Sequence, residues 1–171
     1  MSQLQDFLAA FVAAIEGTAI ADSIRENDVL FPFIESIHVI AISLVVGSIL
    51  TLDLRLLGLA SLQRPVNRLT SSILPVTWGA FAIAVITGLL LFISNATKYL
   101  ANGYFDAKLC LIAAAGLNMM IFHGISARDM AKWEQEKATP TSARIAGALS
   151  ILIWIAVVAC GRMIGFTMDS L

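Results

Sequence analysis

Four long stretches of this sequence are almost wholly apolar, and polar or turn-forming residues separate them. Each stretch is long enough to cross the hydrocarbon core of a bilayer as a helix, which takes about 20 apolar residues. Lipid offers no hydrogen bonds, so each spanning helix must pair its own peptide groups. The pattern therefore predicts an all-α integral membrane protein, an up-and-down four-helix transmembrane bundle with helices over Phe31–Leu57, Ile73–Tyr99, Tyr104–Ser126 and Ala143–Met168.

Short polar links separate these stretches. Ser61–Arg68 is expected to form a turn between the first two helices, and Asn102–Gly103 a tight turn between the next two. The last link, Arg128–Lys137, has the composition of a charged helical extension, and Thr139–Pro140 can cap and open the final helix. Because the links are short, helices that are neighbours in sequence should pack together.

The first residues carry apolar side chains at helical spacing but are interrupted too often to span a membrane. Glu16, Gly17, Asp22 and Arg25 break the apolar pattern. We interpret this part as an interfacial helix or a pair of short helices, because its apolar face would be wasted in water. A flexible tail is the alternative. The expected domains are residues 1–29, an N-terminal interfacial helical segment, and residues 30–171, the four-helix transmembrane domain.

The composition supports a membrane location. Of the 171 residues, 58% are hydrophobic and 13% charged, and a chain this apolar has too little polar surface for a water-soluble domain. The net charge of −1 excludes the basic excess of a nucleic-acid binder, so no nucleic acid is expected as a partner. Cys110 and Cys160 lie in apolar runs, where a thiol behaves as a small hydrophobe, and we expect no disulfide between them.

Positive charge sets the expected orientation, because Lys and Arg concentrate in cytoplasmic links. Arg25 and Lys98 lie near one side of the predicted bundle, with Lys108 and Arg162 inside the apolar runs on that side. The other side is expected to be cytoplasmic, which places both termini in the periplasm if the chain lies in the inner membrane. That side holds Arg55, Arg64, Arg68, Arg128, Lys132, Lys137 and Arg144.

Ionisable side chains inside spanning helices are costly, so they are the default functional candidates. With 3.6 residues per turn, the ionisable residues form one stripe on each of two predicted helices. The first helix carries Glu35, His38 and Asp53, and the third carries Lys108 and His123, with Met119 on the same stripe. Depth along the helices then separates them. Glu35, His38, Lys108 and Arg162 belong to an outer layer, and His123 lies in an inner layer at the level of Asp53.

The two histidines suggest haem, because imidazole is a common axial ligand and helical bundles hold haem between helices. His38 and His123 differ in depth by about 15 to 20 Å from the helical rise, too far to share one iron. We therefore expect His38 to hold a haem in the outer layer, with Lys108 or Arg162 meeting its propionates. His123, with Met119 nearby, is the candidate for a second, inner site.

Each of these residues also has a purely structural interpretation. Either histidine could simply hydrogen-bond a neighbouring helix. Lys108 and Arg162 could extend to the outer interface, and Glu35 could only neutralise one of them. The methionines could fill gaps in the packing.

Several of these segments resemble a family of small bacterial four-helix membrane proteins of unknown function, over about residues 30 to 168. The segments are Glu35–Val39, Gly47, Asp53–Gly58, Thr87–Leu90, Phe105–Leu109, Phe122–His123 and Gly161–Gly165. More distantly, the order of motifs is similar to the haem-binding membrane protoporphyrinogen oxidase family and to CopD-like domains. That likeness implies that His38 and Lys108 are the functional positions. The Asp53–Gly58 stretch and the extension after Arg128 depart from the oxidase pattern, so the likeness does not carry the porphyrinogen reaction itself.

Three function hypotheses follow. The first is a b-type haem protein of the membrane, passing electrons between a quinone or redox partner protein and an acceptor, as a haem-dependent oxidoreductase would. The second is transport or handling of copper or another metal, with His38 and His123 as ligands, since imidazole and thioether groups suit Cu(I). The third is a structural subunit of a membrane complex, in which the polar stripes only fix the packing. A homo-oligomer is compatible with each.

Overall fold

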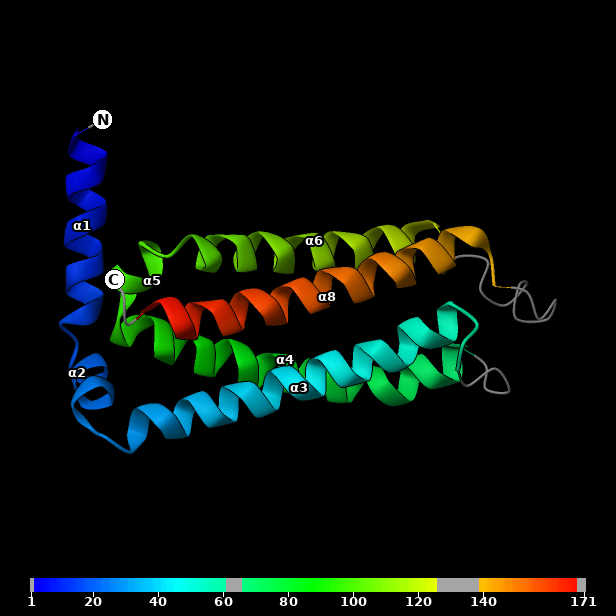
Figure 1. Ribbon diagram of the computed structural model, residues 1–171, viewed down its shortest axis with the longest axis horizontal. Coiled ribbons are helices and arrows are strands. Elements are labelled where there is room, and N and C mark those ends of the chain that lie inside the picture. Colours follow the sequence, from blue (N-terminus) through cyan, green and yellow to red (C-terminus); the bar gives the residue numbers. More distant parts are fainter. Residues whose placement is uncertain (1, 61–65, 126–138, 169–171) are drawn as a thin grey trace.

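The computed structural model describes residues 2–60, 66–125 and 139–168, which form seven helices and no strand. Four are long: α3 (Leu30–Leu56), α4 (Val66–Ser94), α6 (Gly103–Ile125) and α8 (Thr141–Thr167). They lie side by side with alternating chain direction (Figure 1), and each is long and apolar enough to cross a membrane. The all-α fold with four candidate spans is therefore confirmed, and it fits a multi-pass membrane protein.

The second long helix differs from its predicted bounds at both ends. α4 begins at Val66, so the predicted turn through Arg68 is wrong in its last residues. Val66 and Leu69 are buried against the bundle, and this packing holds the polar first turn in the helix. At the other end α4 stops at Ser94, and a short helix, α5 (Ala96–Leu100), follows.

The expectation that helices adjacent in sequence pack together holds for α3 with α4 and for α6 with α8, but it is wrong for α4 and α6, which have no comparable contact in the described residues. At the predicted tight turn, the Asn102 side-chain oxygen accepts a hydrogen bond from the Tyr104 amide over 3.0 Å, which satisfies a free donor at the start of α6. Pro140 directly precedes α8. The predicted charged extension, Arg128–Lys137, lies outside the described residues. Cys110 and Cys160 are free thiols, as expected.

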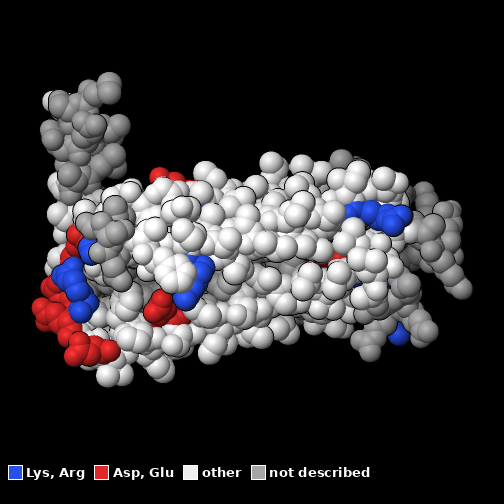
Figure 2. All heavy atoms as spheres, in the orientation of Figure 1, with Lys and Arg blue, Asp and Glu red and all other residues white. Residues whose placement is uncertain are grey.

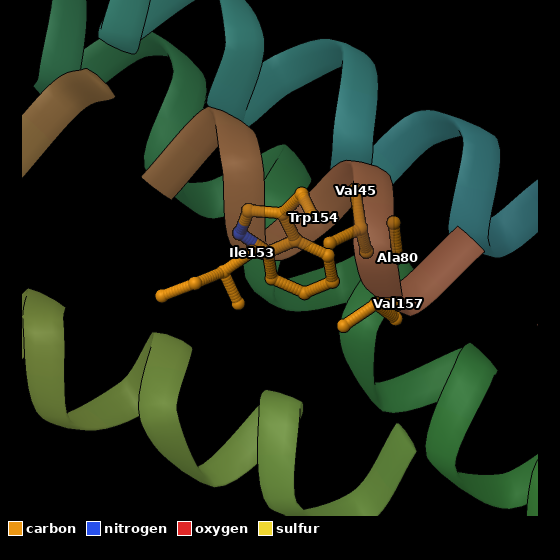
Figure 3. Packing of buried hydrophobic residues seen from close by; sticks show 5 residues of the cluster. All are labelled: Val45, Ala80, Ile153, Trp154 and Val157. Carbon is orange, nitrogen blue, oxygen red and sulfur yellow. The ribbon is translucent and has the colours of Figure 1, made fainter. Parts of the chain in front are cut away.

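The core lies where three of the long helices meet. Val45 from α3 and Ala80 from α4 pack against three residues of α8, namely Ile153, Trp154 and Val157 (Figure 3). Val45 and Val157 are each 1% exposed. In lipid, where apolar surface gains little from leaving the solvent, such close packing is the main force between helices. α6 joins the bundle by packing along α8.

Gly147 lies at a close contact between α8 and α3. A Cβ atom there would lie 3.2 Å from the Asp53 carbonyl oxygen and 3.3 Å from Leu56 Cβ, whereas one at Gly165 would meet nothing within 4 Å. Gly147→Val is therefore expected to lower stability by about 1–3 kcal/mol more than Gly165→Val, because overpacking must push the helices apart. Thermal unfolding of the two purified variants in one detergent measures the difference. Equal melting temperatures would contradict this contact.

Two short helices, α1 (Ser2–Glu16) and α2 (Ala19–Glu26), precede the bundle, which confirms the interpretation as a pair of short helices. α1 runs across the end of the bundle rather than along it (Figure 1). The Glu16 carboxylate accepts hydrogen bonds from the Thr97 amide (2.7 Å) and hydroxyl (2.9 Å). Arg25 of α2 donates to the Ser94 carbonyl at the end of α4. An interfacial location stays a prediction, but this placement is the one that such a helix would need.

On the face seen in Figure 2, charged atoms gather towards the two ends of the bundle, and few lie between them. The end that carries α2 and the start of α3 holds Asp22, Glu26 and Asp28 close together in sequence. The opposite end holds Arg55, Arg68 and Arg144, which lie at the ends of α3, α4 and α8. Arg55, Arg68 and Arg144 thus lie together at the end that the sequence predicts to be cytoplasmic, and the orientation itself stays a prediction.

Candidate functional site

The imidazole of His38 is held in one orientation between α3 and α4. Its Nδ1 lies 2.9 Å from Thr87 Oγ1. The Thr87 hydroxyl already donates its hydrogen to the Ile83 carbonyl over 2.7 Å, and the Ala84 carbonyl also faces the ring. The tautomer with its hydrogen on Nδ1 suits this arrangement, because the Thr87 oxygen can then accept from the ring while its own hydrogen stays on the Ile83 carbonyl. In the neutral ring the lone pair is then left on Nε2.

Gly88 lets this ring lie directly on the backbone of α4. A Cβ atom at position 88 would be 3.0 Å from His38 Cε1 and 3.5 Å from Nδ1. A contact of 3.0 Å is tighter than nine in ten of those that real Cβ atoms make, so a larger residue would push against the imidazole. The Thr87-Gly88 pair therefore acts as one unit, in which the hydroxyl orients the ring and the glycine makes room for it.

Lys108 approaches the same region from α6. Its side chain is half-buried, its charge acts on the His38 ring, and its ammonium group lies beside Gly161 of α8, where a Cβ atom would be 3.8 Å from Nζ. The four long helices thus each contribute to one place: His38, the Thr87-Gly88 pair, Lys108 and Gly161. The sequence predicted His38 and Lys108 in one layer, and the structure brings them together.

Glu35 and Arg162, also predicted for this outer layer, have other neighbours. Glu35 is exposed and faces Tyr99. Burial raises the pKa of Tyr99 to about 12, and the negative charge of Glu35 adds to the effect, so the phenol stays protonated as a hydrogen-bond donor. Arg162 is exposed, and its guanidinium lies 4.3 Å from the centre of the Phe166 ring, a cation–π contact one turn along its own helix.

His123 lies in a different part of the bundle. Its Nδ1 donates to the carbonyl of Met119 in its own helix over 2.9 Å, and the side chain is exposed. Among the described residues no group of three His, Cys, Asp or Glu side chains could hold a metal ion. The inner site predicted from His123 and Met119 therefore has no preformed ligand cluster there.

His123 instead lines a cavity of about 210 Å³ between the four long helices. Asp53 of α3, Ser150 of α8 and Asn118 of α6 line it too, which confirms that His123 and Asp53 lie at one level. His38 is not among the lining residues. The histidines thus occupy separate places, as the depth argument predicted.

The sequence alone did not indicate the contacts that Thr87 and Gly88 make with His38, or the contact of Ser150 with Asp53. Thr87 and Gly88 entered only through the resemblance, and Ser150 not at all. Thr87 and Ser150 interrupt apolar runs, which is the signal that could have drawn attention to them. The side chains that these two residues contact could not be predicted from the sequence, because they depend on which faces of the helices meet.

Comparison with known proteins identifies a family without a known function. The model of the family described as "Family of unknown function (DUF6644)" matches residues 23–167. No curated protein and no solved structure matches the chain. The resemblance to a family of unknown function is therefore confirmed, whereas no link to the protoporphyrinogen oxidase or CopD-like families is found.

Proposed function

The chain belongs to DUF6644, a family of unknown function, and we propose that it is an inner-membrane protein that binds haem b and takes part in electron transfer. His38 serves as the axial ligand through Nε2, and Lys108 meets a haem propionate. The observation that carries this proposal is the hydrogen bond from His38 Nδ1 to Thr87 Oγ1. It orients the ring through one nitrogen and leaves the other available.

This donor arrangement fits a haem ligand. A histidine that binds a metal generally donates its second ring N–H to a fixed acceptor, which sets the tautomer and makes the ligating nitrogen more basic. Thr87 is such an acceptor, because its own hydrogen is already donated to Ile83. When bound, haem would supply one-electron redox chemistry. The protein itself would fix the imidazole, offer a cation and keep the site within the apolar bundle.

The Lys108 ammonium completes the arrangement by its charge. An ammonium within a spanning helix is costly unless an anion or a water-filled space meets it. Lys108 is half-buried and lies beside Gly161, where the small residue leaves room around the ammonium. A propionate is an anion of the right charge for this position. The electron partner is a quinone or a redox protein, and both termini face the periplasm.

The absorption spectrum of the purified full-length protein tests the proposal. Expressed with a supply of haem, the protein is expected to show a Soret band, sharpened α and β bands after reduction with dithionite, and about one haem per chain from a single site. Metal analysis of the same sample separates the alternatives. A haem-free preparation that also fails to bind added haem would overturn the proposal. Stoichiometric copper in that preparation would favour metal handling, and the absence of both haem and copper would favour a structural subunit.

A further inference from the structure

The cavity on the Asp53 side of the bundle has the size and walls of a small-molecule site. Its volume is about 210 Å³, and a cavity of about 150 Å³ already holds a benzene molecule. Aromatic side chains form much of the wall: Trp78, Phe81, Phe122 and Trp154. Such a lining favours a flat, apolar, single-ring molecule.

Asp53 is the unusual group in this apolar wall. The residue is 6% exposed, and the Ser150 hydroxyl lies within hydrogen-bonding reach of its carboxyl group. Its second oxygen, Oδ2, is buried without a hydrogen-bond partner in the part of the chain that the structure describes. Buried polar atoms are nearly always paired, and Asp53 is one of the residues that line the cavity, so its unpaired oxygen is the place nearest the cavity where a hydrogen-bond donor is missing.

Two other polar groups in the wall are already engaged. The Thr77 hydroxyl donates to Ser48 Oγ over 2.8 Å, and the Asn118 amide donates to the Ala146 carbonyl over 3.0 Å. Asp53 Oδ2 is the buried side-chain polar atom that has no hydrogen-bond partner among the described residues, and it is the acceptor that a ligand hydroxyl would use. Gly147 supports this geometry, because its bare backbone packs against Asp53.

Two of the residues that line the cavity also reach the outer surface of the bundle. In the described residues α3 packs along α4 and α6 along α8, while α4 and α6 have no comparable contact with each other. Trp78 of α4 is 51% exposed and Met119 of α6 is 39% exposed, yet both line the cavity. In a bundle that spans the membrane this side faces lipid, so we infer that a ligand would arrive between these two helices, dissolved in lipid.

We propose that this cavity binds a lipid-soluble aromatic molecule of one ring that carries a hydroxyl group, a phenol or hydroquinone, with Asp53 Oδ2 accepting the hydroxyl hydrogen. The aromatic walls bury the ring, and the unpaired oxygen selects the hydroxyl. The site is independent of the haem proposal, because none of its lining residues belongs to the group around His38.

Two ligands of the same shape test the role of the hydroxyl group. Equilibrium dialysis of the full-length protein in detergent is carried out with 4-methylphenol and with p-xylene, in which a methyl group replaces the hydroxyl. We expect saturable binding of 4-methylphenol about tenfold tighter or more than that of p-xylene, because only the phenol pairs with Asp53. Equal affinity for the two, or no saturable binding of 4-methylphenol, would overturn the proposal.

Two aspartate variants locate the interaction. Asp53→Leu removes the acceptor and is expected to weaken 4-methylphenol binding about tenfold while leaving p-xylene binding close to unchanged. Asp106→Leu, at an exposed position near the start of α6, makes the same side-chain exchange and should change neither. Unaltered binding of 4-methylphenol by a folded Asp53→Leu protein would show that the hydroxyl does not pair with Asp53.

A measurement on the wild-type protein makes the test independent of whether Asp53→Leu folds. Dicyclohexylcarbodiimide is an apolar reagent that modifies carboxyl groups in membranes, and peptide mass spectrometry locates the modification. Saturating 4-methylphenol is expected to protect Asp53, whereas p-xylene at the same concentration should protect it less. Labelling of Asp53 that 4-methylphenol does not reduce would count against occupancy of this cavity.

Discussion

Replacing His38 by alanine is expected to abolish the haem absorption of the purified protein, whereas His123→Ala should keep it. His38 offers a ring nitrogen that is free while Thr87 and the backbone of α4 fix the rest of the imidazole. His123 is exposed and bonded to Met119 in its own helix, outside this arrangement. The two variants remove the same side chain, so the difference between them reports the ligand and not the loss of any histidine.

The measurement is the ratio of Soret absorbance to protein in samples purified with identical haem supply. Loss of the only axial imidazole should lower this ratio about tenfold or more. A chromatogram of each variant in detergent controls for folding, and added imidazole should restore part of the band in His38→Ala by occupying the vacated position. Haem retained by His38→Ala, or lost equally from His123→Ala, would remove His38 from the axial position.

Most of the bundle could be predicted from the sequence, because the membrane imposes a simple rule on segment length. The runs that became α3, α6 and α8 are bounded by charge, by Gly103 and by Pro140, and the helices end near those marks. The beginning of α4 could not be predicted in this way. Asn67 and Arg68 are typical of a turn, and only the burial of Val66 and Leu69 against other helices makes the segment helical.

The candidate site could be predicted only as far as depth. Counting turns places His38 and Lys108 in one layer, and the structure agrees. Counting cannot tell which face of an apolar helix meets its neighbour and which meets lipid, because both faces consist of the same residue types. For this reason the contacts of Thr87 and Gly88 with His38, and the turning of Arg162 onto Phe166, required the packed structure.

Gly88→Val should displace the His38 ring without touching the ligand itself. The new Cβ atom would lie 3.0 Å from Cε1, so the imidazole must rotate away and give up its hydrogen bond to Thr87. Loss of such a supporting interaction weakens metal binding by about 10- to 100-fold. Gly79→Val is the matched control, because it adds the same side chain to α4 at an exposed position where a Cβ atom meets nothing within 4 Å.

Haem titration of the two glycine variants measures the affinity directly. We expect Gly88→Val to bind haem more weakly than Gly79→Val while both retain the helical circular dichroism of the wild type. Thr87→Val separates orientation from space, because it removes the acceptor but keeps the shape of the side chain, and it should shift the Soret maximum or the reduction potential with a smaller loss of affinity. If Gly88→Val and Gly79→Val bind haem equally well, His38 binds haem without the support of α4, and the proposed role of the Thr87-Gly88 pair is wrong.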